Sequence, residues 1–336
     1  MNTVNHLELI LPASVWPDSA SREAIWRDLP LPALAQLYGK AAKQSGADLT
    51  SLLSQRYGVS SLAIAPQLLS SLSLPLEAGY WLCVDPVSLR VDRDHLTVLG
   101  APYLTVSQAE ADALVQALNA LYQADGYYFV APTPNRWFVR LPQNPQLEFT
   151  PIKAALGRNL NTVLPRGDGA LQFNALLNEI QMLLYSHAVN DARDEAGQML
   201  INSVWLWGGG DYPPAALPQA EQPILGLDDL LLALNGEVSV PQSWAEVTQT
   251  NTAVLLDELE VHAIYGAGYE WQQVWLRWEQ DWFTPVLAAL KSGQLRQLTL
   301  HFPDVAERAV IKNSDLWRFW RKAELPRHLI HQDSSQ

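Results

Sequence analysis

Cysteine is almost absent from this sequence, which has one, Cys83, among 336 residues. A single cysteine excludes an internal disulfide framework and any zinc site built from several thiolates, and it fits a reducing compartment. Basic residues are also scarce, since 22 Lys and Arg stand against 35 Asp and Glu for a formal net charge of −13. This negative field repels phosphate backbones and anionic lipid, so we expect no nucleic acid and no membrane as a partner.

Long hydrophobic runs are missing as well. No stretch approaches the about 18 uninterrupted apolar residues of a membrane-spanning helix. The first residues, MNTVNHLELILPASVWPD, contain only a short apolar run and no basic segment before it. They predict a first strand and no signal peptide, so we expect a cytoplasmic protein.

Hydrophobic residues make up 48% of the chain, which suffices for a full core. Segments with strand character alternate with segments of helical spacing, which predicts an α/β fold: a three-layer α/β/α protein with a largely parallel sheet covered on both faces. A polar, proline-containing stretch at 142–169 suggests a domain boundary. We expect residues 1–75 and 170–336 to form the core and residues 76–169 to form an inserted, smaller α/β lobe.

Several local elements are predicted within this frame. Ser107 and Glu110 have the spacing of a capping box at the start of a helix. The stretch 127–141 predicts two strands around a turn, and 170–197 predicts one long helix or two short ones. The stretch 258–265, ELEVHAIY, predicts a further strand.

Three consecutive glycines, Gly208, Gly209 and Gly210, follow the apolar stretch INSVWLW. They have neither the Lys-Ser/Thr pair of a phosphate-binding Walker loop nor the Gly-x-Gly-x-x-Gly spacing of a dinucleotide site. No Gly-x-Ser-x-Gly element of a serine hydrolase is present either. Two alternatives stay open: a turn packed beside a neighbouring backbone, or a loop that faces a ligand.

His187, Asn190 and Arg193 recur every three residues, so a helix would place them on one face. An imidazole, an amide and a guanidinium that converge near the glycines could bind an anion such as phosphate. The alternative is that they cap and brace the strand that follows.

Trp271, Trp275, Trp278 and Trp282 form one helical stripe. Most such stripes are core, and the alternative is a partner interface. The C-terminal stretch 314–332 is basic and aromatic in an acidic chain, which suits a surface helix or a docking peptide.

The seven histidines are scattered, without His-x-His or His-Glu-x-x-His spacing. His262, His301 and Asp304 are too few ligands for a two-metal site, so we expect each to be structural. We predict no metal, no cofactor and no catalytic residue.

The stretch SHAVNDARDEAGQMLINSVWLWGGG resembles a segment of archaeal-type cofactor-independent phosphoglycerate mutases, members of the alkaline-phosphatase-like superfamily. There a His-Pro-Val-Asn stretch, an arginine and an Asn-x-x-Trp-x-Trp-Gly-x-Gly strand follow one another. The segments PNRWFVRL and VLPRGDGA precede this stretch, and residues 258–304 follow it. Each is similar to a segment of that family's proteins, and the segments occur there in the same order. The resemblance implies that family's fold over most of the chain.

A closer resemblance is to the RpfE-type regulatory protein family of proteobacteria, whose members are often automatically labelled phosphoglycerate mutase. The positions that match are Trp81, Asp85, Pro86, Leu89, Asp92, Asp94, Asn202, Trp205, Trp207 and the three glycines. This family implies no defined activity.

The chain departs from the enzyme pattern at each catalytic position. The resemblance implies two divalent metals held by Asp and His, and a serine nucleophile. Pro12 and Ala13 stand where an Asp-Gly pair is expected, no Gly-Ser-Asp turn occurs around 51–61, and AGYEW offers neither the Asp nor the Gly-His of the later ligand segment.

We therefore expect a catalytically inactive binding or regulatory protein, whose partner is an unknown protein or a small anionic ligand. Its anion pocket would comprise His187, Asn190, Arg193, Asn202 and the glycine run, with Arg136 closing over it. Two alternatives remain. One is an active metal-dependent phosphomutase or phosphohydrolase built on His262, His301 and Asp304, and the other is a scaffold that acts through the tryptophan stripe or the C-terminal segment.

Overall fold

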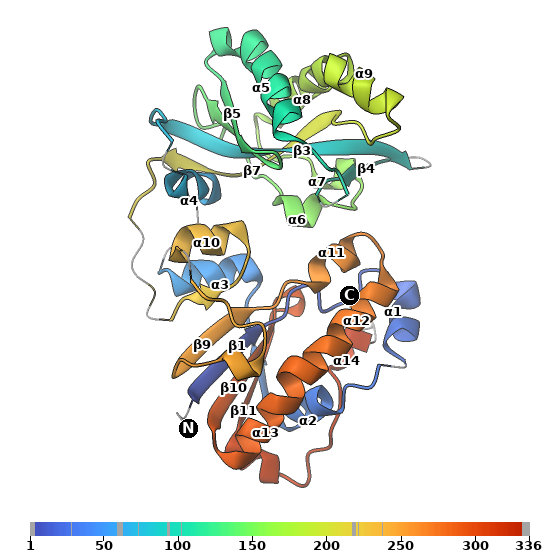
Figure 1. Ribbon diagram of the computed structural model, residues 1–336, viewed down its shortest axis with the longest axis vertical. Helices are drawn as coiled ribbons and strands as arrows, with labels where there is room; N and C mark the ends of the chain where they lie inside the picture. Colours follow the sequence, from blue (N-terminus) through green and yellow to red (C-terminus); the bar gives the residue numbers. More distant parts are fainter. Residues whose placement is uncertain are drawn as a thin grey trace. The chain divides into compact units, whose positions relative to one another are not determined.

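The computed structural model describes residues 4–27, 29–58, 63–72, 74–92, 95–101, 103–216, 220, 222–236 and 238–330. The chain divides into two compact units (Figure 1): unit 1 is Met1–Leu62 with Leu217–Gln336, and unit 2 is Ala63–Ala216. These limits differ from the expected lobe at 76–169. The reason is that β7 (Ser203–Tyr212) pairs with β3 (Gly79–Asp92). This pairing places residues 170–216 in unit 2 instead of in the core.

Unit 1 is built on a six-stranded sheet in the order β2-β11-β10-β1-β9-β8. The four strands from β10 to β8 are parallel, whereas β11 and β2 run antiparallel to their neighbours. This mixed sheet with its helices confirms the α/β class. The strands are β1 (Val4–Ile10), β2 (Ala42–Ser45), β8 (Ile224–Leu225), β9 (Asn251–Leu255), β10 (Leu295–Phe302) and β11 (Glu307–Lys312).

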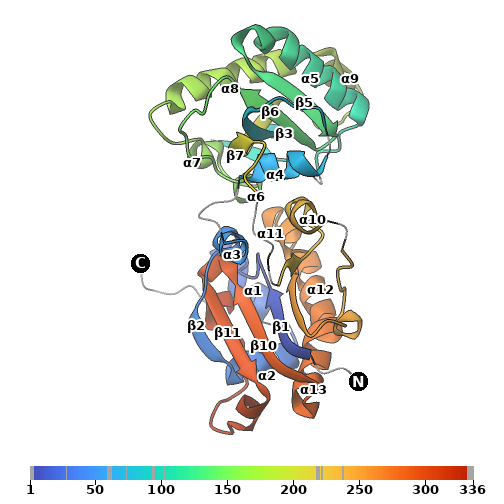
Figure 2. The same ribbon diagram turned by 90° about the vertical axis from the view of Figure 1, so that its left-hand side faces the viewer.

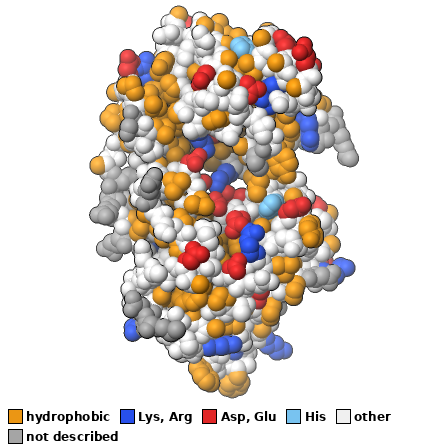
Figure 3. Space-filling model, in the orientation of Figure 1, with side chains coloured by type: hydrophobic (Ala, Val, Ile, Leu, Met, Phe, Trp, Pro, Cys, Tyr) orange, Lys and Arg blue, Asp and Glu red, His pale blue; other side chains and the backbone are white. Residues whose placement is uncertain are grey.

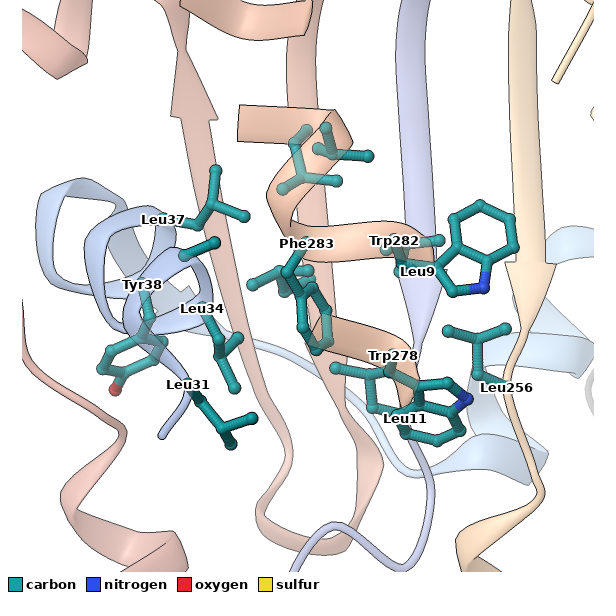
Figure 4. Packing of buried hydrophobic residues seen from close by; sticks show 14 of the residues in the cluster. Leu9, Leu11, Leu31, Leu34, Leu37, Tyr38, Leu256, Trp278, Trp282 and Phe283 are labelled. Atoms are coloured by element: carbon teal, nitrogen blue, oxygen red, sulfur yellow. The ribbon is translucent and has the colours of Figure 1, made fainter. Parts of the chain in front are cut away.

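One face of this sheet carries the hydrophobic core. Because side chains alternate along a strand, Leu7 and Leu9 of β1 point to the same side as Leu298 and Leu300 of β10, and all four are fully buried. Figure 4 shows Leu9 and Leu11 packed with Trp278, Trp282 and Phe283 from the helices that cover this face. The helices of unit 1 are α1 (Ser19–Trp26), α2 (Pro32–Lys40), α3 (Leu49–Arg56), α10 (Asp229–Asn235), α11 (Leu259–Ile264), α12 (Gly268–Trp278), α13 (Thr284–Ser292) and α14 (Arg327–Ile330).

The tryptophan stripe belongs to this core. Trp271, Trp275, Trp278 and Trp282 are at most 1% exposed. This burial corrects the interface alternative, because a side chain without accessible surface cannot contact a partner. Between α12 and α13 the helix widens into one π turn (Glu279–Phe283), and the buried Glu279 carboxylate accepts hydrogen bonds from the first N–H groups of α2.

Unit 2 contains a five-stranded antiparallel sheet in the order β4-β3-β6-β5, with β7 paired to β3. The hairpin of β5 and β6 confirms the predicted turn. The stretch before β7 forms two helices, the 16-residue α8 and the 8-residue α9, so neither one long helix nor two short ones describes it fully. The remaining elements of unit 2 are α4 (Ile64–Ser71), β4 (His95–Leu99), α5 (Gln108–Tyr122), β5 (Tyr128–Thr133), β6 (Arg136–Leu141), α6 (Ile152–Ala155), α7 (Leu160–Val163), α8 (Ala170–Tyr185) and α9 (Ala188–Glu195).

The capping box at Ser107 is confirmed, since its hydroxyl accepts from the Glu110 N–H and the Glu110 carboxylate accepts from the Ser107 N–H. The predicted strand at 258–265 is wrong. The stretch forms α11, with Leu259 and Ala263 buried four residues apart, and the strand of this region is the preceding β9.

Candidate functional site

The face of the unit 1 sheet opposite the core carries a polar groove with a volume of about 1110 Å³. Figure 2 looks onto this side of the sheet, with β2, β11, β10 and β1 toward the viewer and α3 at one end. The groove, called the sheet groove below, is lined along the strands by His6, Glu8, Gln44, Gln297, Thr299, His301, Arg308 and Lys312, and at its ends by Arg56, Asp315 and Arg318.

Strand alternation produces this lining. His6 and Glu8 of β1 are the residues between the core leucines, and Thr299 and His301 of β10 have the same relation to theirs. Parallel pairing sets the strands in a register that brings Glu8 beside Thr299. The result is a mainly polar surface on these strands, interrupted by Val310 of β11, whereas the other side of the sheet is apolar.

The centre of the sheet groove is an ion-paired network around Glu8. Its carboxylate accepts hydrogen bonds from Arg56 Nη2 at 3.0 Å and lies 2.9 Å from His301 Nε2. His6 Nε2 is 2.9 Å from the Thr299 hydroxyl and its Nδ1 is 3.8 Å from the carboxylate. His301 and Glu8 are 5% and 7% exposed, so the network is largely shielded from water.

The network fixes the charges of its members. Burial by itself raises the pKa of the Glu8 carboxyl, but the hydrogen bond with His301 and the guanidinium of Arg56 outweigh it and lower this pKa to about 2. Burial, together with the neighbouring His301 and Arg56, lowers the pKa of His6 despite the opposing pull of Glu8. At neutral pH Glu8 is therefore an anion and His6 is uncharged.

The rim of the sheet groove has an excess of positive charge. Glu8 balances Arg56, and Asp315 pairs with Arg318 at 2.7 Å. Arg308 and Lys312 then remain, two exposed cations four residues apart on the groove side of β11 with Val310 between them, and neither forms an ion pair with any of the described residues. A chain of net charge −13 thus presents two uncompensated cations beside a polar floor.

Sequence analysis missed this site. The only signal is that polar residues alternate with apolar ones in VNHLELI, LRQLTLHF and ERAVIK, three segments that the fold sets side by side. Their juxtaposition depends on pairing between distant parts of the chain.

The residues expected to form an anion pocket lie in unit 2 and are held by internal hydrogen bonds. His187 caps α9 by accepting from the Val189 N–H. Arg193 donates to the carbonyls of Met199 and Thr105 and to the Glu110 carboxylate. These contacts agree with the alternative in which the residues cap a helix and brace the strand that follows.

Asn190 and Asn202 also bind backbone. The Asn190 amide bridges the Leu184 carbonyl with both backbone groups of Ile201, and Asn202 pairs with the N–H and C=O of Leu89. Asn202 and the glycines lie at opposite ends of β7, about 20 Å apart at ~3.3 Å per residue. The structure does not bring these groups into one pocket.

Asn190→Ala is expected to cost about 2–4 kcal/mol of unfolding free energy, because it leaves three buried backbone groups without their partner. Urea unfolding checks this against Gln198→Ala, an exposed substitution in the loop that follows α9, which should stay within about 0.5 kcal/mol of the parent. Equal midpoints for the two variants would contradict the bracing role.

The glycine run packs against its neighbours. A Cβ at Gly209 would lie 2.5 Å from the Tyr80 hydroxyl, and one at Gly210 would lie 2.4 Å from the Ala63 Cβ. Close approach of β3 and the start of α4 explains these two glycines, which corresponds to the packing alternative.

Arg136 does not cover the glycines either. Its guanidinium pairs with the buried Asp85 and lies 5.0 Å from the centre of the Trp207 ring, while the Trp207 indole N–H donates to the same carboxylate at 2.8 Å. Asp85 and Trp207 are two of the positions that carried the regulatory-family resemblance, and the structure gives them a shared structural contact.

The alternative catalytic set is also dispersed. His301 belongs to the Glu8 network, His262 lies on α11, and Asp304 accepts hydrogen bonds from the N–H groups of Ala13 and Val15. Asp304 therefore holds the loop after β1, where the metal-dependent enzymes are expected to carry a ligand. Nowhere in the described ranges do three His, Cys, Asp or Glu side chains gather closely enough to hold a metal ion. These residues do not fit a two-metal centre.

No helix within the described part of the chain has the length and apolar character needed to cross a bilayer.

Comparison with curated proteins finds partial matches to phosphoglycerate mutases. The 2,3-bisphosphoglycerate-independent phosphoglycerate mutase of Methanosarcina mazei is 29% identical over 147 residues, 41% of this chain and 37% of that protein. The enzyme of Methanosarcina barkeri is 29% identical over 163 residues, which is 46% of this chain and 41% of that protein. A probable enzyme of the same name from Geobacter sulfurreducens is 30% identical over 113 residues, which is 33% of this chain and 28% of that protein. The matches thus span less than half of each relative. No protein-family model matches the chain.

Among solved structures, the PH0037 protein from Pyrococcus horikoshii has a TM-score of 0.51 at 10% identity, over 98% of this chain and 93% of that one. A cofactor-independent phosphoglycerate mutase from Thermoplasma acidophilum has a TM-score of 0.41 at 12% identity, over 99% and 95%. The likeness to the Pyrococcus horikoshii protein extends over almost the whole chain and agrees with the mixed α/β fold. The partial sequence matches make the chain a distant homologue of 2,3-bisphosphoglycerate-independent phosphoglycerate mutases.

Proposed function

We propose that this protein is a non-catalytic relative of phosphoglycerate mutases that binds a small anion in the sheet groove and acts as a binding or regulatory protein. The observation that carries the proposal is the pair of uncompensated cations, Arg308 and Lys312, beside a polar floor in a strongly acidic chain. A field that repels anions elsewhere favours them here.

The lining suits a phosphate ester or a carboxylate. A guanidinium and an ammonium form charge-assisted hydrogen bonds with such oxygens, and Thr299 and Gln297 offer neutral donors deeper in the groove. The volume of about 1110 Å³ is at the upper end of small-molecule sites. Phosphoglycerate, which is part of the relatives' names, carries a phosphate ester and a carboxylate and is therefore the first probe.

The absence of catalysis is part of the same proposal. Asp304 is committed to the loop at 13–15, and Glu8, which lies nearest to His301, is committed to Arg56. A dication would have to compete with the Arg56 guanidinium for Glu8, and binding to Asp304 would have to displace the backbone N–H groups of the loop at 13–15.

The test is isothermal titration of the full chain with 3-phosphoglycerate and, separately, with inorganic phosphate. The double variant Arg308→Gln/Lys312→Gln is expected to bind roughly 10- to 100-fold more weakly than the parent, because two charge-assisted contacts are lost. The matched control is Arg296→Gln, which removes an exposed cation of β10 that does not line the groove and should leave the affinity unchanged.

Three results would count against the proposal. If neither probe binds, or if the control weakens binding as much as the double variant does, the groove is not an anion site. Turnover of 3-phosphoglycerate with added Mn²⁺, abolished by His301→Ala, would instead support the active phosphomutase.

Assignment to the RpfE-type regulatory proteins and a cytoplasmic location complete the proposal. The first is supported by the matching positions from Trp81 to Gly210, and the second by the single cysteine.

A further inference from the structure

Two of the thirteen tryptophans are exposed, and they lie together. Trp317 and Trp320 are 82% and 66% exposed, and Phe319 between them is 87% exposed, whereas the other eleven tryptophans are at most 9% exposed. The residues 317–320, called the aromatic segment below, thus hold both exposed tryptophans and an exposed phenylalanine within four positions. Large exposed aromatics in one place are typical of a contact surface.

The backbone of the aromatic segment is fixed. Lys40 Nζ donates to the carbonyls of Leu316 and Arg318, and Arg321 Nη1 donates to the carbonyls of Lys40 and Ala41. The rings are therefore held outward by a tied main chain. A surface fixed before binding loses little conformational entropy when a partner covers it.

The surroundings of the aromatic segment are basic. Lys43, Arg321 and Lys322 line a second hollow of about 540 Å³ that reaches Trp320 and contains one carboxylate, that of Glu324. The chain as a whole is acidic, and red acidic side chains are spread over the face seen in Figure 3. Charge complementarity thus selects an acidic partner.

We propose that the aromatic segment and the hollow beside it form a docking site for an acidic segment of a partner protein that carries apolar side chains. The rings of Trp317, Phe319 and Trp320 would contact the apolar side chains, and Lys322 would pair with a carboxylate of the partner. Lys43 already forms an ion pair with Glu324 at 3.9 Å and adds to the basic surroundings of the hollow. This inference does not depend on the sheet groove. An anionic bilayer and a second copy of the chain are the other possible occupants, and the experiment below distinguishes them from a partner protein.

The test uses a synthetic 15-residue peptide in which Glu alternates with Leu and Phe, and a second peptide with Lys in place of each Glu. Binding is followed by protection of tryptophan fluorescence from acrylamide, because the exposed indoles are those of Trp317 and Trp320. The acidic peptide is expected to protect the parent protein, and Trp317→Ser/Phe319→Ser/Trp320→Ser is expected to bind it at least 10-fold more weakly when titrated calorimetrically.

The matched control is Leu171→Ser/Met182→Ser/Tyr185→Ser, which removes three side chains of α8 that are 69–83% exposed. It should bind the acidic peptide as the parent does. Failure of the acidic peptide to bind, or equal binding of the Lys peptide, would overturn the proposal. So would concentration-dependent self-association, or sedimentation with phosphatidylcholine/phosphatidylserine vesicles, that the aromatic variant abolishes, since the occupant would then be a second copy or a membrane.

Discussion

Trp275→Ala is expected to lower the free energy of unfolding by about 3–5 kcal/mol, the range for removing a large aromatic side chain from a packed core. Trp275 is fully buried at the centre of an aromatic cluster. Its ring centre lies 5.1 Å from that of Trp26, 5.7 Å from Trp271 and 5.4 Å from Trp278. Alanine would leave a cavity between the helices and the sheet that these rings cannot fill without moving.

Trp275→Phe is the matched variant. The indole N–H of Trp275 is buried without a hydrogen-bond partner among the described residues, so phenylalanine removes an unsatisfied donor and keeps most of the apolar contact. We expect a cost of about 1–2 kcal/mol or less. Chemical unfolding followed by circular dichroism measures both variants. A loss for phenylalanine as large as for alanine would mean that packing of the six-membered ring is not what stabilises this site.

This core was predictable because its signal is local. The four tryptophans at 271–282 recur with the period of a helix, and periodicity alone placed them on one face. The capping box at Ser107 and the hairpin turn at 133–135 were predictable for the same reason, since each depends on residues a few positions apart.

The sheet groove was not predictable because no local pattern contains it. Almost the whole chain separates His6 from Thr299 and Arg308, and only the pairing of β1 with β10 and of β10 with β11 sets the three on one surface. A scattered set of histidines in the sequence thus included two that the fold joins through Glu8.

The glycine run shows a different limit. Three glycines signal that something approaches the backbone closely, but the sequence does not identify what approaches. The hydroxyl of Tyr80 and the Cβ of Ala63 fill that space. The domain limits were misplaced for a related reason: the partner of β7 lies far back in the chain, in β3.

Glu8→Gln is expected to lower the free energy of unfolding by about 3 kcal/mol at pH 7, because it leaves Arg56 in a half-buried position without its anionic partner. The pKa gives the same magnitude. Lowering the pKa of Glu8 from 4.5 to about 2 corresponds to roughly 3 kcal/mol of preferential stabilisation of the charged form in the folded protein. Glu23→Gln is the control, since Glu23 forms an exposed pair with Arg27 at 4.0 Å and should change stability by less than about 0.5 kcal/mol.

The pH dependence separates loss of this charge from loss of packing. A carboxyl whose pKa is lowered on folding contributes its stability fully above its unfolded pKa of about 4.5 and loses that contribution as the pH falls toward about 2. The difference in unfolding free energy between the parent and Glu8→Gln should therefore be constant from pH 7 to pH 5 and shrink steadily below pH 4.5. Urea titrations at intervals across this window measure it. A difference that stays constant down to pH 3 would show that Glu8 stabilises the sheet groove by its shape and hydrogen bonds, not as the anion that holds Arg56 and His301 together.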